Sequence, residues 1–267
     1  MERYKNYFEA NQHTWNQRVG IHKDSKFYDL GSFKAGKSSL ISSIEKKELP
    51  DVRDKRLLHL QCHFGMDTLS WEREGAIVTG IDFSDKAIQV ARQLTTDLQL
   101  NANFVCSNVY DLRTNLEGPF DIVFTSYGVI GWLPDLDNWA SIIAHFLKPG
   151  GIFYMAEFHP VLFMFDEQLE ALKYHYTNHE VIELEVEGTY TDGDATIQGK
   201  EYGWNHSLSE VINALLAHGL NIELFNEFTY SPFPCFPNLV QGVDGNWRIK
   251  GLEGKIPMVY SIRARKS

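Results

Sequence analysis

The chain has 267 residues, of which 43% are hydrophobic and 22% are charged, a balance typical of a globular protein with one large domain. Its 35 acidic and 25 basic residues give a net charge of −10, which argues against nucleic acid as the main partner because phosphate binding requires basic patches. No apolar stretch approaches the roughly 18 residues that span a bilayer, so we expect no membrane segment.

The amino-terminal sequence is polar and aromatic and lacks the apolar stretch of a signal peptide. The three cysteines, Cys62, Cys106 and Cys235, are odd in number and widely spaced. This pattern favours reduced thiols over a disulfide framework. We therefore expect a cytoplasmic protein.

Residues 1–50 are polar with scattered aromatic side chains. Within them, the sequence SLISSIEKKELP (39–50) predicts a short amphipathic helix that ends at Pro50. We interpret residues 1–50 as an N-terminal helical cap on a domain that comprises residues 51–267.

From residue 56 onward, short apolar stretches alternate with helical patterns, which is typical of βαβ units and a parallel sheet. Ser84 is a suitable N-cap, and Asp85 lies in the first turn, where a carboxylate suits the helix dipole. The predicted strands are residues 56–61, 76–82, 103–107, 120–126 and 151–158, and the predicted helices are residues 66–74, 84–100 and 137–151.

The alternation breaks at residues 159–206, where strand-like stretches and turn signals predict an antiparallel β insertion. A helix follows at 207–219, with Ser207 as its N-cap, and two last strands are expected at 221–228 and 255–266. The predicted fold is an α/β, doubly wound, seven-stranded and mostly parallel sheet. We expect the insertion to cap the substrate side.

The first strand ends in an unusual turn, LLHLQCHFG (57–65), that contains one glycine, one cysteine and two histidines. His59, Cys62 and His63 could in principle ligate a metal. Zinc, however, requires about four ligands in tetrahedral array, and the other cysteines lack partner-like spacing. We therefore expect no metal site, and we interpret Cys62 as a small buried residue.

The order of the elements and five motifs resemble the class I S-adenosylmethionine-dependent methyltransferases, particularly those that act on small molecules. The motifs are LLHLQCHFG, GIDFS, NVYDL, FDIVFTSYGVIGWLPDL and LKPGG. The resemblance is good over residues 55–158 and implies a Rossmann-like methyltransferase fold. The first motif departs from the family pattern, because His59 replaces an Asp and Gln61 and His63 replace two glycines.

The resemblance also implies which residues bind the cofactor. Asp82 matches the acid that holds the ribose hydroxyls, Phe83 would cover the adenine, and Asn108 and Val109 would read its edge. Ser126 and Tyr127 would lie beside the methyl group. Trp132 closely follows the fourth strand, and we expect it to contact the cofactor because aromatic faces attract a sulfonium. Gly65 would belong to the first turn, and Gln61 and His63 would either grip the methionyl end or fill space.

The residues themselves favour a nucleoside without phosphate. A dinucleotide requires a glycine-lined helix N-terminus so that its pyrophosphate can approach the backbone amides. This turn has lost most of its glycines but is followed by Asp82, close to the roughly 20-residue spacing of a ribose-binding acid. The cofactor expected from this comparison is S-adenosyl-L-methionine.

Two histidines are candidate general bases. His159 follows the fifth strand, and His206 precedes the last helix, and both places open onto the substrate side in this architecture. Histidine is the usual base when a nucleophile must lose a proton near neutral pH. The alternative for each is a hydrogen-bonded structural residue.

The predicted function is therefore methyl transfer from S-adenosylmethionine to a small-molecule substrate. Two other classes remain open at this point. One is a protein that binds S-adenosylmethionine without transferase activity, suggested by the altered first motif. The other is a nicotinamide-dependent oxidoreductase.

Overall fold

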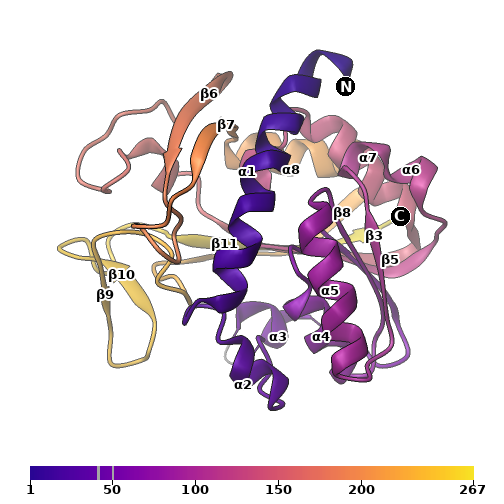
Figure 1. The fold of residues 1–267 in the computed structure, drawn as a ribbon. Coiled ribbons are helices and arrows are strands. Elements are labelled where there is room, and N and C mark those ends of the chain that lie inside the picture. The colour runs from indigo at the N-terminus through magenta and orange to yellow at the C-terminus, as the bar shows by residue number, and fades with distance from the viewer. Residues whose placement is uncertain (41–42, 50) are drawn as a thin grey trace.

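A seven-stranded sheet in the order β3-β2-β1-β4-β5-β11-β8 lies at the centre of the computed structural model, which describes residues 1–40, 43–49 and 51–267 (Figure 1). Strands β1 to β5 pair in parallel, whereas β11 runs antiparallel to both β5 and β8. The predicted doubly wound, mostly parallel sheet is therefore confirmed. The strands are β1 (Arg56–Leu60), β2 (Ile77–Asp82), β3 (Ala102–Cys106), β4 (Phe120–Ser126), β5 (Leu147–Phe158), β8 (Leu220–Phe228) and β11 (Val259–Lys266).

Helices cover both faces of this sheet (Figure 1). One face packs against α3 (Ile44–Glu48), α4 (Met66–Arg73) and α5 (Asp85–Asp97), and the other against α6 (Leu112–Asn115), α7 (Leu136–Phe146) and α8 (Leu208–Ala217). Helix α5 shows why these segments are helical. Its N-cap Ser84 accepts a hydrogen bond from the Ala87 amide, and its apolar residues repeat on the single face that is buried.

Two segments outside this sheet lie against each other over the carboxyl ends of its strands. The first is α1 (Lys5–Asp24), which is followed by α2 (Leu30–Lys34), and the second is the hairpin of β6 (Asn178–Glu187) and β7 (Gln198–Asn205). The Asn11 side chain donates to the Tyr202 carbonyl and accepts from the Tyr202 amide, both at 2.8 Å. The predicted antiparallel insertion is thus confirmed, and α1 is docked on it.

Three details differ from the sequence prediction. The helix expected over 39–50 is the shorter α3, and Pro50 lies outside the described residues. Helix α7 ends at Phe146, beside the predicted Lys-Pro-Gly-Gly stop, but β5 begins at Leu147 and not at residue 151, because Pro149 favours an extended backbone at the residue before it. The segment after β8 contains an unpredicted hairpin, β9 (Leu239–Gln241) with β10 (Trp247–Ile249).

The order of the strands locates the expected site. From β1 the chain moves outward through β2 to β3, then returns to the other side of β1 with β4 and β5. In open α/β sheets, ligands bind beyond the carboxyl ends of the strands where the order reverses. That point lies between β1 and β4, under α1 and the β6–β7 hairpin.

Candidate functional site

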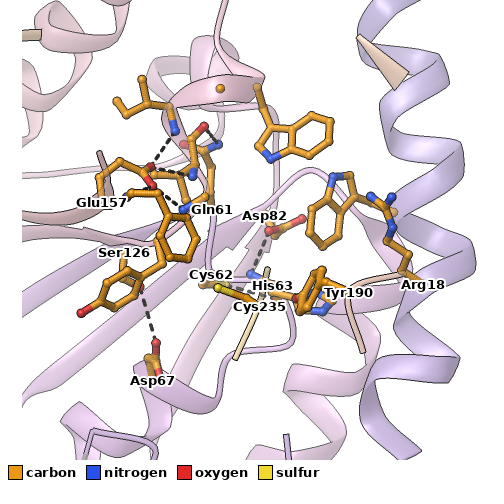
Figure 2. Close-up of a pocket in the computed structure, with 18 of the residues that line it drawn as sticks. Arg18, Gln61, Cys62, His63, Asp67, Asp82, Ser126, Glu157, Tyr190 and Cys235 are labelled. Carbon is orange, nitrogen blue, oxygen red and sulfur yellow. Dashed lines mark hydrogen bonds between the residues drawn. The ribbon is translucent and has the colours of Figure 1, made fainter. Parts of the chain in front are cut away.

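A cavity of about 730 Å³ opens at this point of the sheet. It is within the size range of small-molecule and cofactor sites. Every residue that the sequence predicted to bind the cofactor lines it: Gln61, His63, Gly65, Asp82, Phe83, Asn108, Val109, Ser126, Tyr127 and Trp132. These residues come from segments far apart in the sequence, and the fold brings them together. Figure 2 shows the central part of this cavity.

The turn after β1 keeps an unusual backbone despite its altered residues. Gly65 has φ +80, and a Cβ there would lie 2.6 Å from the Phe104 ring, so glycine is required. Gln61 and His63 also have positive φ angles, 55° and 50°. Because a left-handed backbone costs a residue with a Cβ roughly 1–2 kcal/mol, other contacts must hold these two residues in place.

Those contacts are hydrogen bonds to neighbouring segments. Gln61 Nε2 donates to the Val129 carbonyl at 3.1 Å, and the His63 amide donates to Asp82 Oδ2 at 2.8 Å. The His63 ring lies 3.0 Å (Nε2 to Nδ1) from His22 of α1. Burial lowers the pKa of both histidines, that of His22 to about 3, so both rings are neutral near pH 7.

Asp82 ends β2 at the centre of the cavity. Its Oδ1 accepts from the Ser84 amide and its Oδ2 from the His63 amide, both at 2.8 Å. Burial raises the pKa of Asp82 to about 6, although these amides favour the charged form. Since a carboxylate has about four acceptor positions, Asp82 keeps room for two hydroxyl donors of a ligand.

Asn108 and Val109 lie on the β3 side of the cavity. The Asn108 side chain accepts from the Tyr110 amide at 3.0 Å and caps the short helix η2 (Val109–Asp111). Phe83 also lines this side, and its carbonyl accepts a hydrogen bond from Gln12 of α1.

The segment after β4 is held by a buried carboxylate that the sequence reasoning missed. Glu157 of β5 accepts hydrogen bonds from the Gly128, Val129 and Ile130 amides. These bonds fix the start of η3 (Ile130–Trp132), which carries Trp132 into the cavity. The sequence did contain a signal for this role, because Glu157 is an acid in an otherwise apolar strand. A buried carboxylate requires hydrogen-bond donors, so such an acid predicts donors nearby.

The two candidate bases are placed differently. His206 lines the cavity, and its Nε2 lies 2.7 Å from the Leu133 carbonyl, so this nitrogen carries the proton. His159 is absent from the cavity lining within the described chain. Its Nε2 contacts Glu227 Oε1 at 2.9 Å, and its Nδ1 accepts from the Val161 amide at 3.2 Å. These contacts favour the structural alternative for His159.

Helix α1 closes the cavity over the turn of β1. Trp15 packs edge-on against His63 and Trp132, with ring centroids 5.3 and 5.5 Å apart. Arg18 lies over the Trp15 ring and forms a buried ion pair with Glu201 of β7. This pair joins α1 to the inserted hairpin above the cavity.

The residues considered as metal ligands have other partners. His59 is buried, its Nδ1 lies 2.8 Å from the Thr68 hydroxyl, and burial lowers its pKa to about 3. Cys62 is a buried free thiol, as Cys62 was interpreted from the sequence. Over residues 1–40, 43–49 and 51–267, no group of three or more His, Cys, Asp or Glu side chains is arranged to hold a metal ion.

Comparison with known proteins agrees with this geometry. Residues 57–151 match the family model described as a methyltransferase domain. Over 144 residues the chain is 30% identical to the ubiquinone biosynthesis O-methyltransferase of Coxiella burnetii, a match that covers 51% of this chain and 61% of that protein. The chain thus spans less than two thirds of the length of this curated relative.

Solved structures share the fold over most of the chain. An S-adenosylmethionine-dependent methyltransferase from Mesorhizobium loti superposes with a TM-score of 0.57 at 20% identity, covering 87% of this chain and 100% of that one. The geranyl diphosphate C-methyltransferase of Streptomyces coelicolor gives a TM-score of 0.55 at 14% identity, covering 86% and 78%.

The fold is therefore that of the class I S-adenosylmethionine-dependent methyltransferases. The stretch that matches the methyltransferase-domain model, residues 57–151, carries the turn of β1, Asp82 and the segment after β4. In the described part of the chain, no helix is long and apolar enough to cross a membrane.

Proposed function

We propose that this chain is a methyltransferase that uses S-adenosylmethionine to methylate a small-molecule acceptor. The observation that carries the proposal is the convergence of all the predicted cofactor residues on one cavity at the reversal point of the sheet. The methyltransferase-domain match and the O-methyltransferase relative support the same class of reaction.

The polar groups of the cavity suit a nucleoside with an amino-acid tail. Asp82 has acceptor positions for ribose hydroxyls, and Phe83, Asn108 and Val109 are the proposed adenine contacts on the β3 side. Gln61 Oε1 is buried and finds no hydrogen-bond partner among the residues that the structure describes, which suits a donor of the bound molecule. The side chains of Gln61 and His63 replace the open glycine turn that a pyrophosphate would need.

When bound, S-adenosylmethionine would supply a methyl group for in-line transfer to an acceptor lone pair, with S-adenosylhomocysteine as the leaving group after the carbon–sulfur bond breaks. The chain contributes chiefly by orienting the two reactants, since correct positioning alone accounts for several kcal/mol of such barriers. Where the acceptor carries a proton, His206 is the proposed base, because it lines the cavity and its Nε2–H is donated to the Leu133 carbonyl. Its Nδ1, which lies 3.9 Å from Glu210 Oε1, is then the nitrogen that takes the proton.

The acceptor is proposed to lie under the two caps, the N-terminal segment 1–50 and the insertion 159–206. Both supply aromatic side chains to the cavity, including Tyr28, Tyr190 and Trp204. This lining suits a small molecule with an apolar or aromatic body. The net charge of −10 argues against nucleic acid, and the free cysteines support a cytoplasmic location.

The test is a transfer assay with methyl-labelled S-adenosylmethionine and a library of small aromatic alcohols, amines and thiols. Label recovered in an acceptor, together with equimolar S-adenosylhomocysteine, is the expected result. Binding of S-adenosylmethionine without any methylated product would instead favour a binding protein. Binding of NADH in its place would favour an oxidoreductase.

A further inference from the structure

One carboxylate in the cavity has no role in what is described above. The carboxylates that line the cavity are Asp29, Asp67, Asp82, Glu157 and Glu201. All but Asp67 have backbone amides or a cation as partners. In the described chain, the hydrogen bonds of Asp67 come only from the hydroxyls of Ser39 and Ser126.

Asp67 therefore has acceptor capacity left. The Ser126 hydroxyl lies at 3.5 Å from its Oδ2, a long hydrogen bond, and the Ser39 hydroxyl binds the other oxygen. A carboxylate that faces a cavity with weak partners on one side is suited to a cationic donor, which forms shorter and stronger hydrogen bonds than a neutral one.

The strand order places Asp67 at the end of the cavity opposite the adenine contacts. Asn108 follows β3, Asp82 ends β2, and the turn of β1 and the end of β4 come next along the edge. Asp67 lies in the first turn of α4, directly after the β1 turn, and contacts Ser126 of β4 (Figure 2). A cofactor with its ribose at Asp82 and adenine at Asn108 extends its tail toward Asp67.

The other carboxylate that lines this end of the cavity, Glu157, is committed to the Gly128, Val129 and Ile130 amides. Where related sequences carry an Asp on the first strand, this chain has His59, which is buried, neutral and bonded to Thr68. The helix dipole of α4 favours a carboxylate at the position of Asp67. Arg18, a buried cation in the cavity lining, is paired with Glu201.

We propose that Asp67 binds the ammonium group of the methionyl tail of S-adenosylmethionine, in place of the acid lost from the first strand. Asp67 is then a cofactor-binding residue that neither the sequence reasoning nor the family comparison assigns. The inference rests on the proposed function, and it predicts which part of the cofactor Asp67 recognises.

The test compares three ligands by titration calorimetry on the full chain and its Asp67→Asn variant. S-adenosylmethionine carries the ammonium and the sulfonium charge, S-adenosylhomocysteine carries only the ammonium, and 5′-methylthioadenosine lacks the whole amino-acid tail. Asp67→Asn should weaken the first two ligands by about ten- to a hundredfold, the loss expected for one charge-assisted hydrogen bond. The affinity for 5′-methylthioadenosine should change less than about twofold.

The matched control is Asp29→Asn, which removes one negative charge at the cavity mouth while asparagine can still cap α2. It should leave all three affinities within about twofold of the parent. Should Asp67→Asn prove unstable, a structure of the parent with S-adenosylhomocysteine serves instead. It should place the ligand ammonium within about 3 Å of an Asp67 oxygen.

Three results would overturn the inference and leave the proposed function intact. They are unchanged binding of S-adenosylmethionine by Asp67→Asn, an equal loss for 5′-methylthioadenosine, and a loss confined to S-adenosylmethionine, which would mean that Asp67 senses the sulfonium. Failure of the parent to bind S-adenosylmethionine at all would overturn the proposed function, and the inference with it.

Discussion

The two ends of the cavity are held in shape by different kinds of contact. At the end proposed for the nucleoside, Asp82 and Asn108 line the cavity, and Asp82 lies among backbone amides. At the methionyl end, Gln61 and His63 take backbone angles that glycine usually provides, and side chains from α1 and β5 hold the turn and the following segment. Side-chain contacts with other segments therefore hold a left-handed backbone at residues that are not glycine.

The first test of this comparison concerns the ion pair of Arg18 and Glu201, which joins α1 to the inserted hairpin above the proposed methionyl end. Arg18→Met would leave Glu201 buried without a partner, which typically costs about 3–5 kcal/mol. Urea unfolding should show that loss in the free energy of unfolding, and the double variant Arg18→Met/Glu201→Leu should regain most of it. A single variant as stable as the parent would show that the pair does not join α1 to the hairpin energetically.

Removing the acid at the nucleoside end should have the largest effect on cofactor affinity. Asp82→Ala eliminates the proposed acceptor of two ribose hydroxyls, so S-adenosylmethionine should bind about a hundredfold more weakly or worse. Because 5′-methylthioadenosine has the same ribose, its affinity should fall equally. Calorimetry of both ligands checks this. A variant that bound S-adenosylmethionine as tightly as the parent would remove Asp82 from the ribose site.

The pH dependence of binding should also report on Asp82. Its pKa is raised to about 6 by burial, so the carboxylate is mostly protonated at pH 5 and mostly charged at pH 7. If the charged form binds the ribose, affinity should fall about tenfold between pH 7 and pH 5. The stability of the free protein depends on pH in the opposite direction. Because the pKa of Asp82 is higher in the folded than in the unfolded chain, this group alone lowers the free energy of unfolding as the pH rises from about 4 to about 6.

This slope should largely disappear in Asp82→Asn, measured with 5′-methylthioadenosine so that Asp67 does not contribute. A slope that persists in the variant would assign the titration to another group.

The smallest expected effect lies at Gln61. Its Oε1 is buried and has no partner within residues 1–40, 43–49 and 51–267. Gln61→Ala should therefore weaken the binding of S-adenosylmethionine by about three- to tenfold, the contribution of one neutral hydrogen bond. The matched variant Gln61→Glu keeps an acceptor and tests whether the partner is a donor of the ligand. Equal affinity in Gln61→Ala would mean that this side chain only fills space and holds Val129.

The sheet, and the residues at the carboxyl ends of its strands that are proposed to bind the cofactor, could be predicted from the sequence because the patterns that indicate them are local. Apolar stretches, N-caps such as Ser84 and the acid that ends β2 each lie within a few residues of the structure they predict. The predicted cofactor residues line one cavity because parallel strands present their carboxyl ends on one edge.

The contacts that fix the methionyl end could not be read in this way, because they join distant segments. Glu157 binds amides of the segment after β4, and Arg18 pairs with Glu201 of the inserted hairpin. Nothing next to these residues in the sequence indicates their partners. The sequence did not indicate a binding role for Asp67 for another reason. An acid in the first turn of a helix is already explained by its favourable interaction with the helix dipole.

The most direct test of the proposed cofactor is titration of the unmodified chain with S-adenosylmethionine and, separately, with NADH. We predict saturable one-to-one binding of S-adenosylmethionine, competed by S-adenosylhomocysteine, and no binding of NADH, because Gln61 and His63 occupy the place of the glycines that a pyrophosphate needs. Binding of NADH without binding of S-adenosylmethionine would contradict the assignment of this cavity.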